Sequence, residues 1–162
     1  MSRPQVEAFD ALGLALCGKR IVEASAGTGK TYAITTLVVR LLLEQELEIS
    51  EILVVTFTEA ATAELRDRVR ARLVEAHGVF GAALAGEPGE GTLFELARCR
   101  ASSLEADRAR LRRAIENVDD APISTIHGFC QRVLRDSAFL ARVPFELQLV
   151  PDLSELVDDV LY

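Results

Sequence analysis

The stretch Ile21-Val22-Glu23-Ala24-Ser25-Ala26-Gly27-Thr28-Gly29-Lys30-Thr31 decides the fold that this sequence predicts. A short β-branched run leads into a loop of small residues, and Gly-Lys-Thr then opens a helix. Backbone N–H groups can close around a polyphosphate only where side chains leave room, which accounts for Gly27 and Gly29. The Lys30 ammonium is predicted to reach the β- and γ-phosphates, and the Thr31 hydroxyl to ligate Mg²⁺ at the positive end of the helix dipole. The stretch therefore predicts a phosphate-binding loop between a strand and a helix.

The predicted nucleotide-binding residues are Ala24, Ser25, Ala26, Gly27, Thr28, Gly29, Lys30 and Thr31. Ala24 stands where the usual motif, G-x-x-x-x-G-K-[ST], begins with glycine. The context supports the motif, because residues 32–44 repeat apolar side chains at the spacing of an amphipathic helix. A Gly-rich turn that binds nothing would not need the Lys-Thr pair.

The composition is that of a globular domain. The chain has 162 residues, 49% of them hydrophobic, which is enough for one core. It contains no apolar run of roughly 18 residues and no basic-then-apolar N-terminus, so we predict no membrane span and a cytoplasmic location. The odd number of cysteines, without CxxC spacing, argues against disulfides and zinc and predicts ordinary buried thiols at Cys17, Cys99 and Cys130.

The charge pattern leaves two interpretations open. A net charge of −7 counts against binding nucleic acid, yet the arginines cluster at 66–72 and 108–113. These clusters indicate either a local basic face on an acidic body or solvated helix faces with i,i+4 ion pairs.

The first third of the chain predicts a strand–helix–strand unit. A helix over 4–16 should end at Gly18, and its Gln5 is either an adenine-reading glutamine or a solvated polar residue. A strand at 20–23 precedes the loop. Residues 52–57 form a continuous apolar run, which is typical of a parallel strand covered on both faces. Together these elements form a βαβ unit.

Polar and aromatic residues follow the predicted strand at 52–57. Thr58 should cap a helix that runs to about residue 76. Residues at the carboxyl ends of parallel strands form the ligand crevice of an open α/β sheet. Hydroxyls and a ring there suit single-stranded nucleic acid, although Phe57 taken alone is equally a core residue.

A helical segment then interrupts the strand–helix alternation. We predict a loop over 78–92, a capping box at Ser102-x-x-Glu105 ahead of a helix, and an insertion spanning 77–121. A strand at 122–127 should bring Thr125 and His127 to the same sheet edge as Lys30 and Thr56. Taken alone, His127 is equally a structural histidine.

The C-terminal residues predict a strand at 146–150 and a helix capped by Asp152. The chain stops within the apolar stripe of that helix. We therefore expect a piece of a longer protein.

Three segments resemble motifs I, Ia and Ib of UvrD/Rep-type superfamily 1 helicases, in the same order: 24–31, 55–66 and 124–130. Within that family the chain most resembles the RecB group, the beta subunits of exodeoxyribonuclease V. The resemblance lies in three stretches: Glu-Ala-Ser-Ala-Gly-Thr-Gly-Lys-Thr, Thr-Phe-Thr-Glu-Ala-Ala-Thr-Ala-Glu-Leu and Thr-Ile-His-Gly-Phe-Cys-Gln-Arg.

The resemblance implies an ATP-dependent motor that moves 3′ to 5′ on single-stranded DNA. Duplex-end DNA and the other subunits of a RecBCD-like complex are the implied partners, and ATP and Mg²⁺ the implied cofactors. The implied fold is a RecA-like P-loop α/β domain, a parallel sheet with flanking helices, present only in part. Its parts are 1–76 and 122–162 from the motor domain and 77–121 as a helical insertion. The implied DNA-contacting residues are Thr56, Phe57, Thr58, Thr125 and His127.

Two parts of the helicase machinery are not found in the sequence. Catalysis needs a Walker B Asp-Glu pair at a strand end and an arginine from a second domain. Asp119-Asp120 and Asp158-Asp159 lie in a polar turn and on a helix. We therefore expect this piece to bind nucleotide without turning it over. Two alternatives stay open: a non-catalytic nucleotide-binding module, and a small kinase with its own Mg²⁺ carboxylate and an Arg-rich lid.

Overall fold

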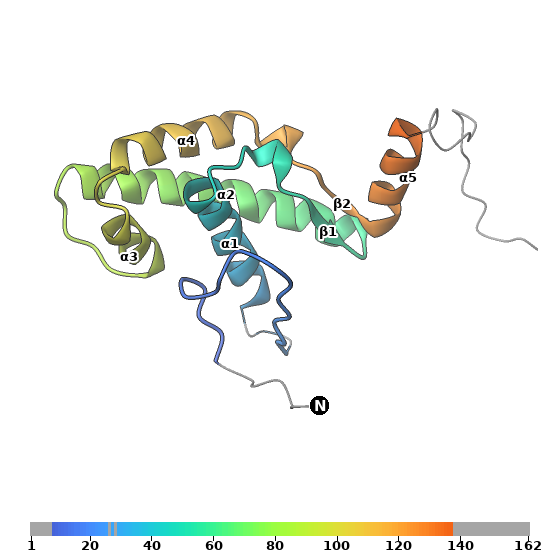
Figure 1. Ribbon diagram of the computed structural model, residues 1–162, viewed down its shortest axis with the longest axis horizontal. Helices are drawn as coiled ribbons and strands as arrows, with labels where there is room; N and C mark the ends of the chain where they lie inside the picture. Colours follow the sequence, from blue (N-terminus) through green and yellow to red (C-terminus); the bar gives the residue numbers. More distant parts are fainter. Residues whose placement is uncertain (1–7, 26, 28, 138–162) are drawn as a thin grey trace, which may run out of the picture.

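The computed structural model describes residues 8–25, 27 and 29–137 (Figure 1). Its elements are α1 (Lys30–Glu44), η1 (Ile49–Glu51), β1 (Val54–Thr56), α2 (Glu59–Leu84), α3 (Thr92–Cys99), α4 (Leu104–Glu116), η2 (Val118–Asp120), β2 (Ile123–Thr125) and α5 (Ile126–Asp136). The described part is mostly helical, with one small parallel sheet. Gln5, Ala26, Thr28 and the elements predicted after residue 145 lie outside the described residues.

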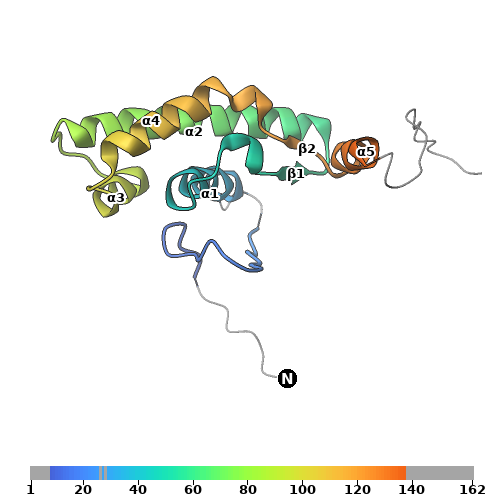
Figure 2. The same ribbon diagram turned by 45° about the horizontal axis from the view of Figure 1, so that its top comes forward.

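The core lies where α1, α2 and α4 pack together. α4 runs alongside α2, and α1 packs beneath this layer (Figures 1 and 2). The fully buried side chains include Val39, Leu43, Leu73, Phe80 and Leu111. The helix over 32–44 is confirmed, and α1 begins two residues earlier, at Lys30. Its predicted apolar face is only partly right, because Val38 and Leu42 are buried but Ile34 is 38% exposed, and the fully buried Val39 and Leu43 were not assigned to it.

Helix α2 is longer than its sequence suggests. The predicted end near residue 76 and the loop from 78 are wrong, because the helix continues to Leu84. Each glycine in a helix interior costs about 1 kcal/mol relative to alanine. Burial of Phe80, which is 0% exposed, offsets that cost. At Gly81, an added Cβ would lie 3.2 Å from Arg108 Nε, so glycine lets α4 pack closely.

The sheet has two parallel strands in the described part. Val54 pairs with Ile123 and Thr56 with Thr125, which confirms parallel strands within the runs 52–57 and 122–127. The helices α2, α3 and α4 form the crossover between the strands. The predicted strand at 20–23 is wrong: the segment pairs with no described strand, and Ile21 is 91% exposed. The βαβ unit expected over 20–57 is therefore not formed, because its first strand lacks a neighbour.

The first predicted helix is also wrong over its described residues, which form turns. A long-range contact holds this segment instead, and tertiary contacts of this kind outweigh weak local helix propensity. The buried Arg40 donates through Nη1 to the carbonyl oxygens of Ala11 and Leu14, both at 2.8 Å. Arg40 thereby holds residues 8–16 against α1, on the side away from α2 (Figure 2).

The predicted capping box at Ser102 does not form. α4 begins at Leu104, and its N-cap Ser103 makes no side-chain cap. Instead the Ser103 hydroxyl donates to Asp107 Oδ2 at 2.7 Å, and Arg100 donates to both oxygens of Asp107 at 2.6 and 2.8 Å. A buried carboxylate needs these donors, so the ion pair takes precedence over the cap.

The cysteine prediction is wrong, because Cys17, Cys99 and Cys130 are all exposed. Each lies on a surface that faces away from the core: a turn, the end of α3 and the outer side of α5.

The arginine clusters form ion-paired helix faces. The pairs in the described part include Arg68–Glu64, Arg70–Asp119, Arg110–Glu46 and Arg113–Glu48. This favours solvated faces over a continuous basic face. Arg110 and Arg113 form ion pairs with Glu46 and Glu48, next to η1. This does not favour the small-kinase alternative, in which these arginines would form a lid.

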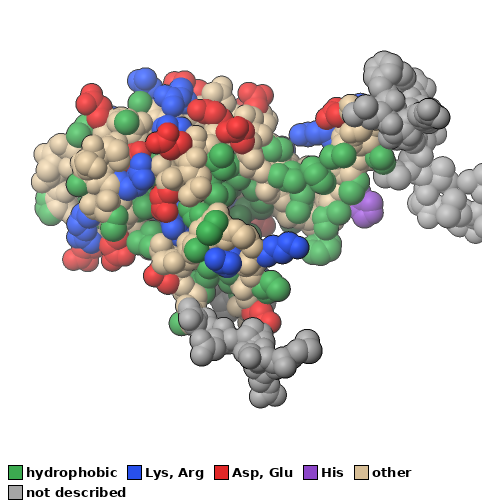
Figure 3. Space-filling model, in the orientation of Figure 1, with side chains coloured by type: hydrophobic (Ala, Val, Ile, Leu, Met, Phe, Trp, Pro, Cys, Tyr) green, Lys and Arg blue, Asp and Glu red, His purple; other side chains and the backbone are tan. Residues whose placement is uncertain are grey.

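Exposed hydrophobic side chains gather over the strand pair and the adjoining α5 (Figure 3). They include Leu53, Val55, Phe57, Ile126 and Val133, each at least 40% exposed. None of the helices in the described ranges has the length and apolarity needed to cross a membrane.

Candidate nucleotide and nucleic-acid sites

The phosphate loop ends at the N-terminus of α1, as predicted. Gly29 is the N-cap, with φ 86°, and Gly27 has φ 77°, both in the left-handed region that favours glycine. An added Cβ at either position would meet nothing within 4 Å. The backbone conformation therefore requires glycine here, and the space beside the loop stays open.

Lys30 closes over its own loop. Its Nζ donates to the carbonyl oxygens of Ala24, at 2.7 Å, and Ser25, at 2.5 Å. An ammonium has three donors, so one is left to face solvent. Lys30 is exposed and lines the cavity beside the loop, whereas Thr31 is half-buried and lines a different cavity, with Arg68 and Arg72.

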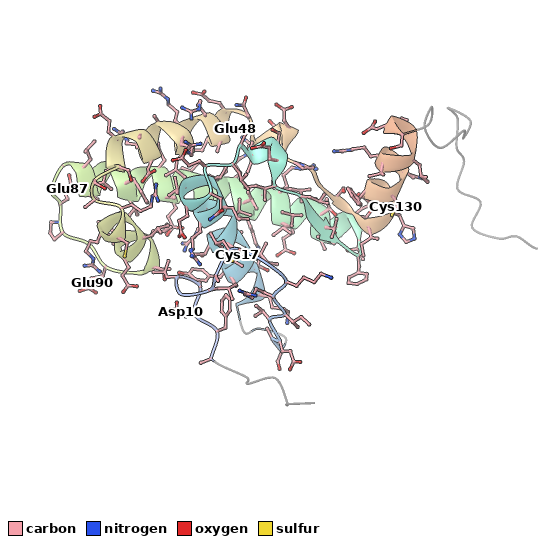
Figure 4. All side chains as sticks on the ribbon, in the orientation of Figure 1. Asp10, Cys17, Glu48, Glu87, Glu90 and Cys130 are labelled. Atoms are coloured by element: carbon pink, nitrogen blue, oxygen red, sulfur yellow. The ribbon has the colours of Figure 1, made fainter. Side chains whose placement is uncertain are left out.

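A cavity of about 600 Å³ opens beside the loop. Its walls come from the turn segment, the loop, α1 and the first turn of α3. The polar lining consists of Asp10, Arg20, Lys30, Tyr32, Thr92 and Glu95, and much of the remainder is apolar. Figure 4 labels Asp10 on the turn segment and Glu90 in the loop that precedes α3. A mostly apolar cavity with a few polar groups is typical of a small-molecule site.

Tyr32 lies in the first turn of α1 and contacts residues of α2 and α3. Its hydroxyl donates to Thr92 Oγ1 at 2.8 Å, and Arg72 Cζ lies 4.4 Å from the ring centroid. Burial raises the pKa of Tyr32. The Thr92 hydrogen bond and the Arg72 charge together lower the pKa by more than burial raises it, so the net pKa lies below 10.0. Sequence reasoning missed Tyr32, although its place directly after Lys30-Thr31 was a signal.

Arg72 is held by the elements around it. It is 8% exposed, donates to Thr36 Oγ1 at 3.0 Å and pairs with Glu75 at 2.8 Å. It also lines a second cavity of about 230 Å³, together with Thr31 and Arg68.

The threonines at the strand ends form a hydrogen-bonded cluster. Thr56 Oγ1 lies 3.0 Å from the Thr58 carbonyl oxygen and 2.6 Å from Thr62 Oγ1. Thr58 caps α2, as predicted, by accepting from Ala61 N at 3.1 Å. Thr125 accepts from Gly128 N and donates to Glu59 Oε1, both at 3.1 Å. Thr58 alone among Thr56, Thr58 and Thr125 has a hydroxyl hydrogen without an acceptor in the described residues.

Phe57 and His127 point outward beside this cluster. Phe57 is 87% exposed, which excludes the core interpretation in the described part. His127 is exposed in the first turn of α5.

A third cavity, of about 260 Å³, lies where the N-termini of α2 and α5 meet. Arg66 and Arg132 line it together with Thr125. Arg66 Nη2 donates to the Ile123 carbonyl oxygen at 2.9 Å, which fixes the guanidinium beside β2. The sequence placed Arg66 in a basic cluster and Arg132 in a motif but assigned neither to a site, because only the fold brings them to one cavity.

The structure does not bring Lys30 to the sheet edge that holds Thr56 and Thr125. The expected shared edge is wrong for the described residues, because 20–23 forms no strand. The cavity beside the loop and the cavity at the strand ends share no lining residue. In the described residues the loop and the strand ends are therefore treated as separate candidate sites.

Known proteins match this chain along most of its length. The profile of the UvrD/REP helicase N-terminal domain matches residues 5–159. The RecBCD enzyme subunit RecB of Escherichia coli K12 is 42% identical over 158 residues, which covers 93% of this chain and 13% of that protein. The corresponding subunit of Haemophilus influenzae is 41% identical, covering 85% and 12%, and that of Mycobacterium tuberculosis H37Rv is 41% identical, covering 87% and 13%. The chain thus spans about 13% of the length of such relatives.

Proposed function

Because this chain belongs to the UvrD/Rep helicase family, we propose that it is the ATP- and DNA-binding N-terminal part of a 3′-to-5′ DNA helicase of the RecB type. The observation that carries the proposal is the glycine loop at the N-terminus of α1, with Lys30 folded over it. The proposed fold is a RecA-like P-loop domain, with motor parts at 1–76 and 122–162 and an insertion at 77–121. The proposed setting is recombinational repair in the cytoplasm, within a RecBCD-like complex.

The loop fits a nucleotide on three grounds. Gly27 and Gly29 adopt the backbone conformation that such loops need, and the dipole of the 15-residue α1 favours an anion at its start. Lys30 offers an exposed ammonium. The cavity beside the loop is large and apolar enough for a nucleoside.

Thr31 is the proposed Mg²⁺ ligand. The described residues contain no group of three His, Cys, Asp or Glu side chains that could hold a metal ion by themselves. Mg²⁺ often binds through one or two protein oxygens together with substrate phosphates and water. Thr31 therefore fits a role in which the nucleotide supplies further oxygens. In this proposal Thr31 and Lys30 bind and orient ATP with Mg²⁺.

The cluster at the strand ends is the proposed DNA site. The Thr58 hydroxyl has a free donor, and Phe57 presents an exposed ring on which a base can stack. His127 lies on the neighbouring first turn of α5. Hydroxyl and guanidinium donors hold phosphates, so Arg66 and Arg132 join the proposed set. Thr56 and Thr125 are positioning residues in this proposal, since their hydroxyls bond within the cluster.

We propose that this chain binds ATP without hydrolysing it. The two described strands end in Thr56 and Thr125, so neither ends in the acidic pair that activates water in helicases.

Calorimetry of the 162-residue chain with ATP and Mg²⁺ tests the proposal. We expect Lys30→Ala to weaken ATP binding by at least about tenfold, the loss of roughly one charge-assisted hydrogen bond. The chain has two lysines, so Lys19→Ala is the matched control and should bind as wild type does. Absence of binding by the wild type would overturn the nucleotide site. ATP hydrolysis that DNA stimulates, and that Lys30→Ala abolishes, would contradict the proposed lack of turnover.

A further inference from the structure

The first turn of α3 forms one wall of the cavity beside the phosphate loop, although α3 belongs to the segment predicted as an insertion. Thr92 and Glu95 line that cavity together with Gly29 and Lys30. We propose that Glu95 determines specificity for the sugar of the bound nucleotide, by accepting hydrogen bonds from the ribose hydroxyls. This inference rests on the ATP site proposed above and assigns part of that site to the insertion.

The chemistry of the lining supports a ribose contact. An ionised carboxylate only accepts hydrogen bonds, so it repels phosphates and attracts donors. In a nucleoside triphosphate the sugar directly follows the phosphates, and its hydroxyls are donors. An acidic residue on the ribose hydroxyls is a known way for proteins to hold nucleotides. This cavity is lined by the Lys30 ammonium, the Glu95 carboxylate and apolar side chains, which fits the phosphates, the sugar hydroxyls and the base of a nucleotide.

Glu95 is the acidic group of this cavity whose position is set by a helix rather than by a turn. Asp10, the other acidic residue of the lining, has Oδ1 bonded to Leu12 N at 2.9 Å, which ties this carboxylate to its own turn. The Glu95 carboxylate has no hydrogen bond or ion pair with any other residue in the described ranges. Its backbone is fixed, since α3 buries Leu93 and Leu96 in the core.

Tyr32 and Thr92 fix the distance between α3 and the loop. The 2.8 Å hydrogen bond joins the first turn of α1 to the first residue of α3. Arg72, which Thr36 and Glu75 hold from the other side, stacks on the same ring. Thr92 and Tyr32 are therefore positioning residues, which keep Glu95 in the lining of the cavity that also contains Lys30.

Calorimetry with a series of ligands tests the assignment of Glu95. The ligands are ATP, 2′,3′-dideoxy-ATP and tripolyphosphate, each with Mg²⁺. We expect wild type to bind ATP about tenfold more tightly than dideoxy-ATP, and Glu95→Ala to bring this ratio close to one without weakening tripolyphosphate binding. Glu90→Ala, a change to an exposed carboxylate that does not line the cavity, should leave both quantities as in wild type.

The outcomes separate the two proposals. Binding that depends on Lys30 but shows no preference for the ribose hydroxyls would overturn the role of Glu95 and leave the ATP site standing. Equal weakening of ATP and tripolyphosphate in Glu95→Ala would also overturn it, because it would indicate a general effect on the loop. Absence of any Lys30-dependent binding would overturn both.

Tyrosine fluorescence gives a second measurement. The chain has two tyrosines, Tyr32 and Tyr162, and no tryptophan, so Tyr162→Phe leaves Tyr32 as the single emitter. Saturation with ATP should change this emission, whereas unchanged emission under conditions where calorimetry detects binding would show that the nucleotide lies elsewhere. In that background Thr92→Val should alter the emission without ligand and lower the ATP preference several-fold. An unchanged preference would overturn the positioning role.

Discussion

The helical layer formed by α2, α4 and η2 buries its large side chains, whereas the segments around the glycine loop and the strand ends leave theirs exposed. In the layer, Phe80, Leu111 and Val118 are completely buried between α2, α4 and η2. On the other side, Ile21 is 91% and Phe57 87% exposed, and the phosphate loop has open space around its glycines. The large apolar side chains that form the core are therefore not those proposed to bind ligands, although Thr58 both caps α2 and belongs to the proposed DNA site. The following variants test how far stability and ligand binding can be changed separately.

Two phenylalanine truncations test the comparison most strongly. Phe80→Ala removes a 0% exposed ring and should lower the free energy of unfolding by about 3–5 kcal/mol. Phe57→Ala removes an exposed ring and should change it by less than about 0.5 kcal/mol. Denaturant unfolding followed by circular dichroism measures both. Similar losses in the two variants would show that the sheet side is packed as tightly as the helical layer.

Two carboxylates give a smaller contrast of the same kind. Asp107, 3% exposed, takes hydrogen bonds from Arg100 and Ser103, and the Asp107 hydrogen bond raises the pKa of Arg100. Asp107→Ala should cost about 2 kcal/mol, because Arg100 loses a charged partner. Glu64→Ala breaks an exposed pair with Arg68 and should cost less than about 0.5 kcal/mol. A loss in Asp107→Ala no larger than that in Glu64→Ala would contradict the structural role of this ion pair.

The pH dependence of stability gives the smallest expected effect. Burial, and after it the charges of Arg108 and Arg112, lower the pKa of His77 below 6.5. The unfolded chain therefore takes up this proton at a higher pH than the folded chain does. Stability should fall as the pH drops through 6.5 and level off below the folded pKa. When the pH is lowered from about 7.5 to about 5.5, the melting temperature should fall less in His77→Gln than in wild type. An equal change in His127→Gln would contradict the assignment to His77.

Local sequence patterns predicted the elements whose causes are local. The apolar run at 52–57, the cap at Thr58 and the helical periodicity of 32–44 all lie within a few residues of the structure they specify. The failures come from distant partners. Arg40 reaches carbonyl oxygens 26 and 29 residues away, and Phe80 is buried by other helices, so no local pattern at 4–16 or 78–84 reveals the outcome.

The candidate sites follow the same division. The loop residues from Ala24 to Thr31 form a contiguous motif, and the sequence alone identifies them. Tyr32, Thr92 and Glu95 meet at one cavity only because α3 packs against α2 and reaches α1 through the Tyr32–Thr92 hydrogen bond, although 60 residues separate these two. Arg66 and Arg132 likewise depend on the meeting of α2 and α5.

The hydrogen bonds from Lys30 to Ala24 and Ser25 occupy donors that a phosphate at the proposed site would also use. At the proposed ATP site, a phosphate can meet the third ammonium donor directly but competes with these two carbonyl oxygens for the other donors, so part of the energy gained is offset. The same contacts keep the lysine next to the loop before any ligand arrives, which spares the entropy of ordering a long side chain at the moment of binding. In the proposed ATP site, the carbonyl contacts of Lys30 therefore lower the affinity for phosphate, but Lys30 is already next to the loop when phosphate binds.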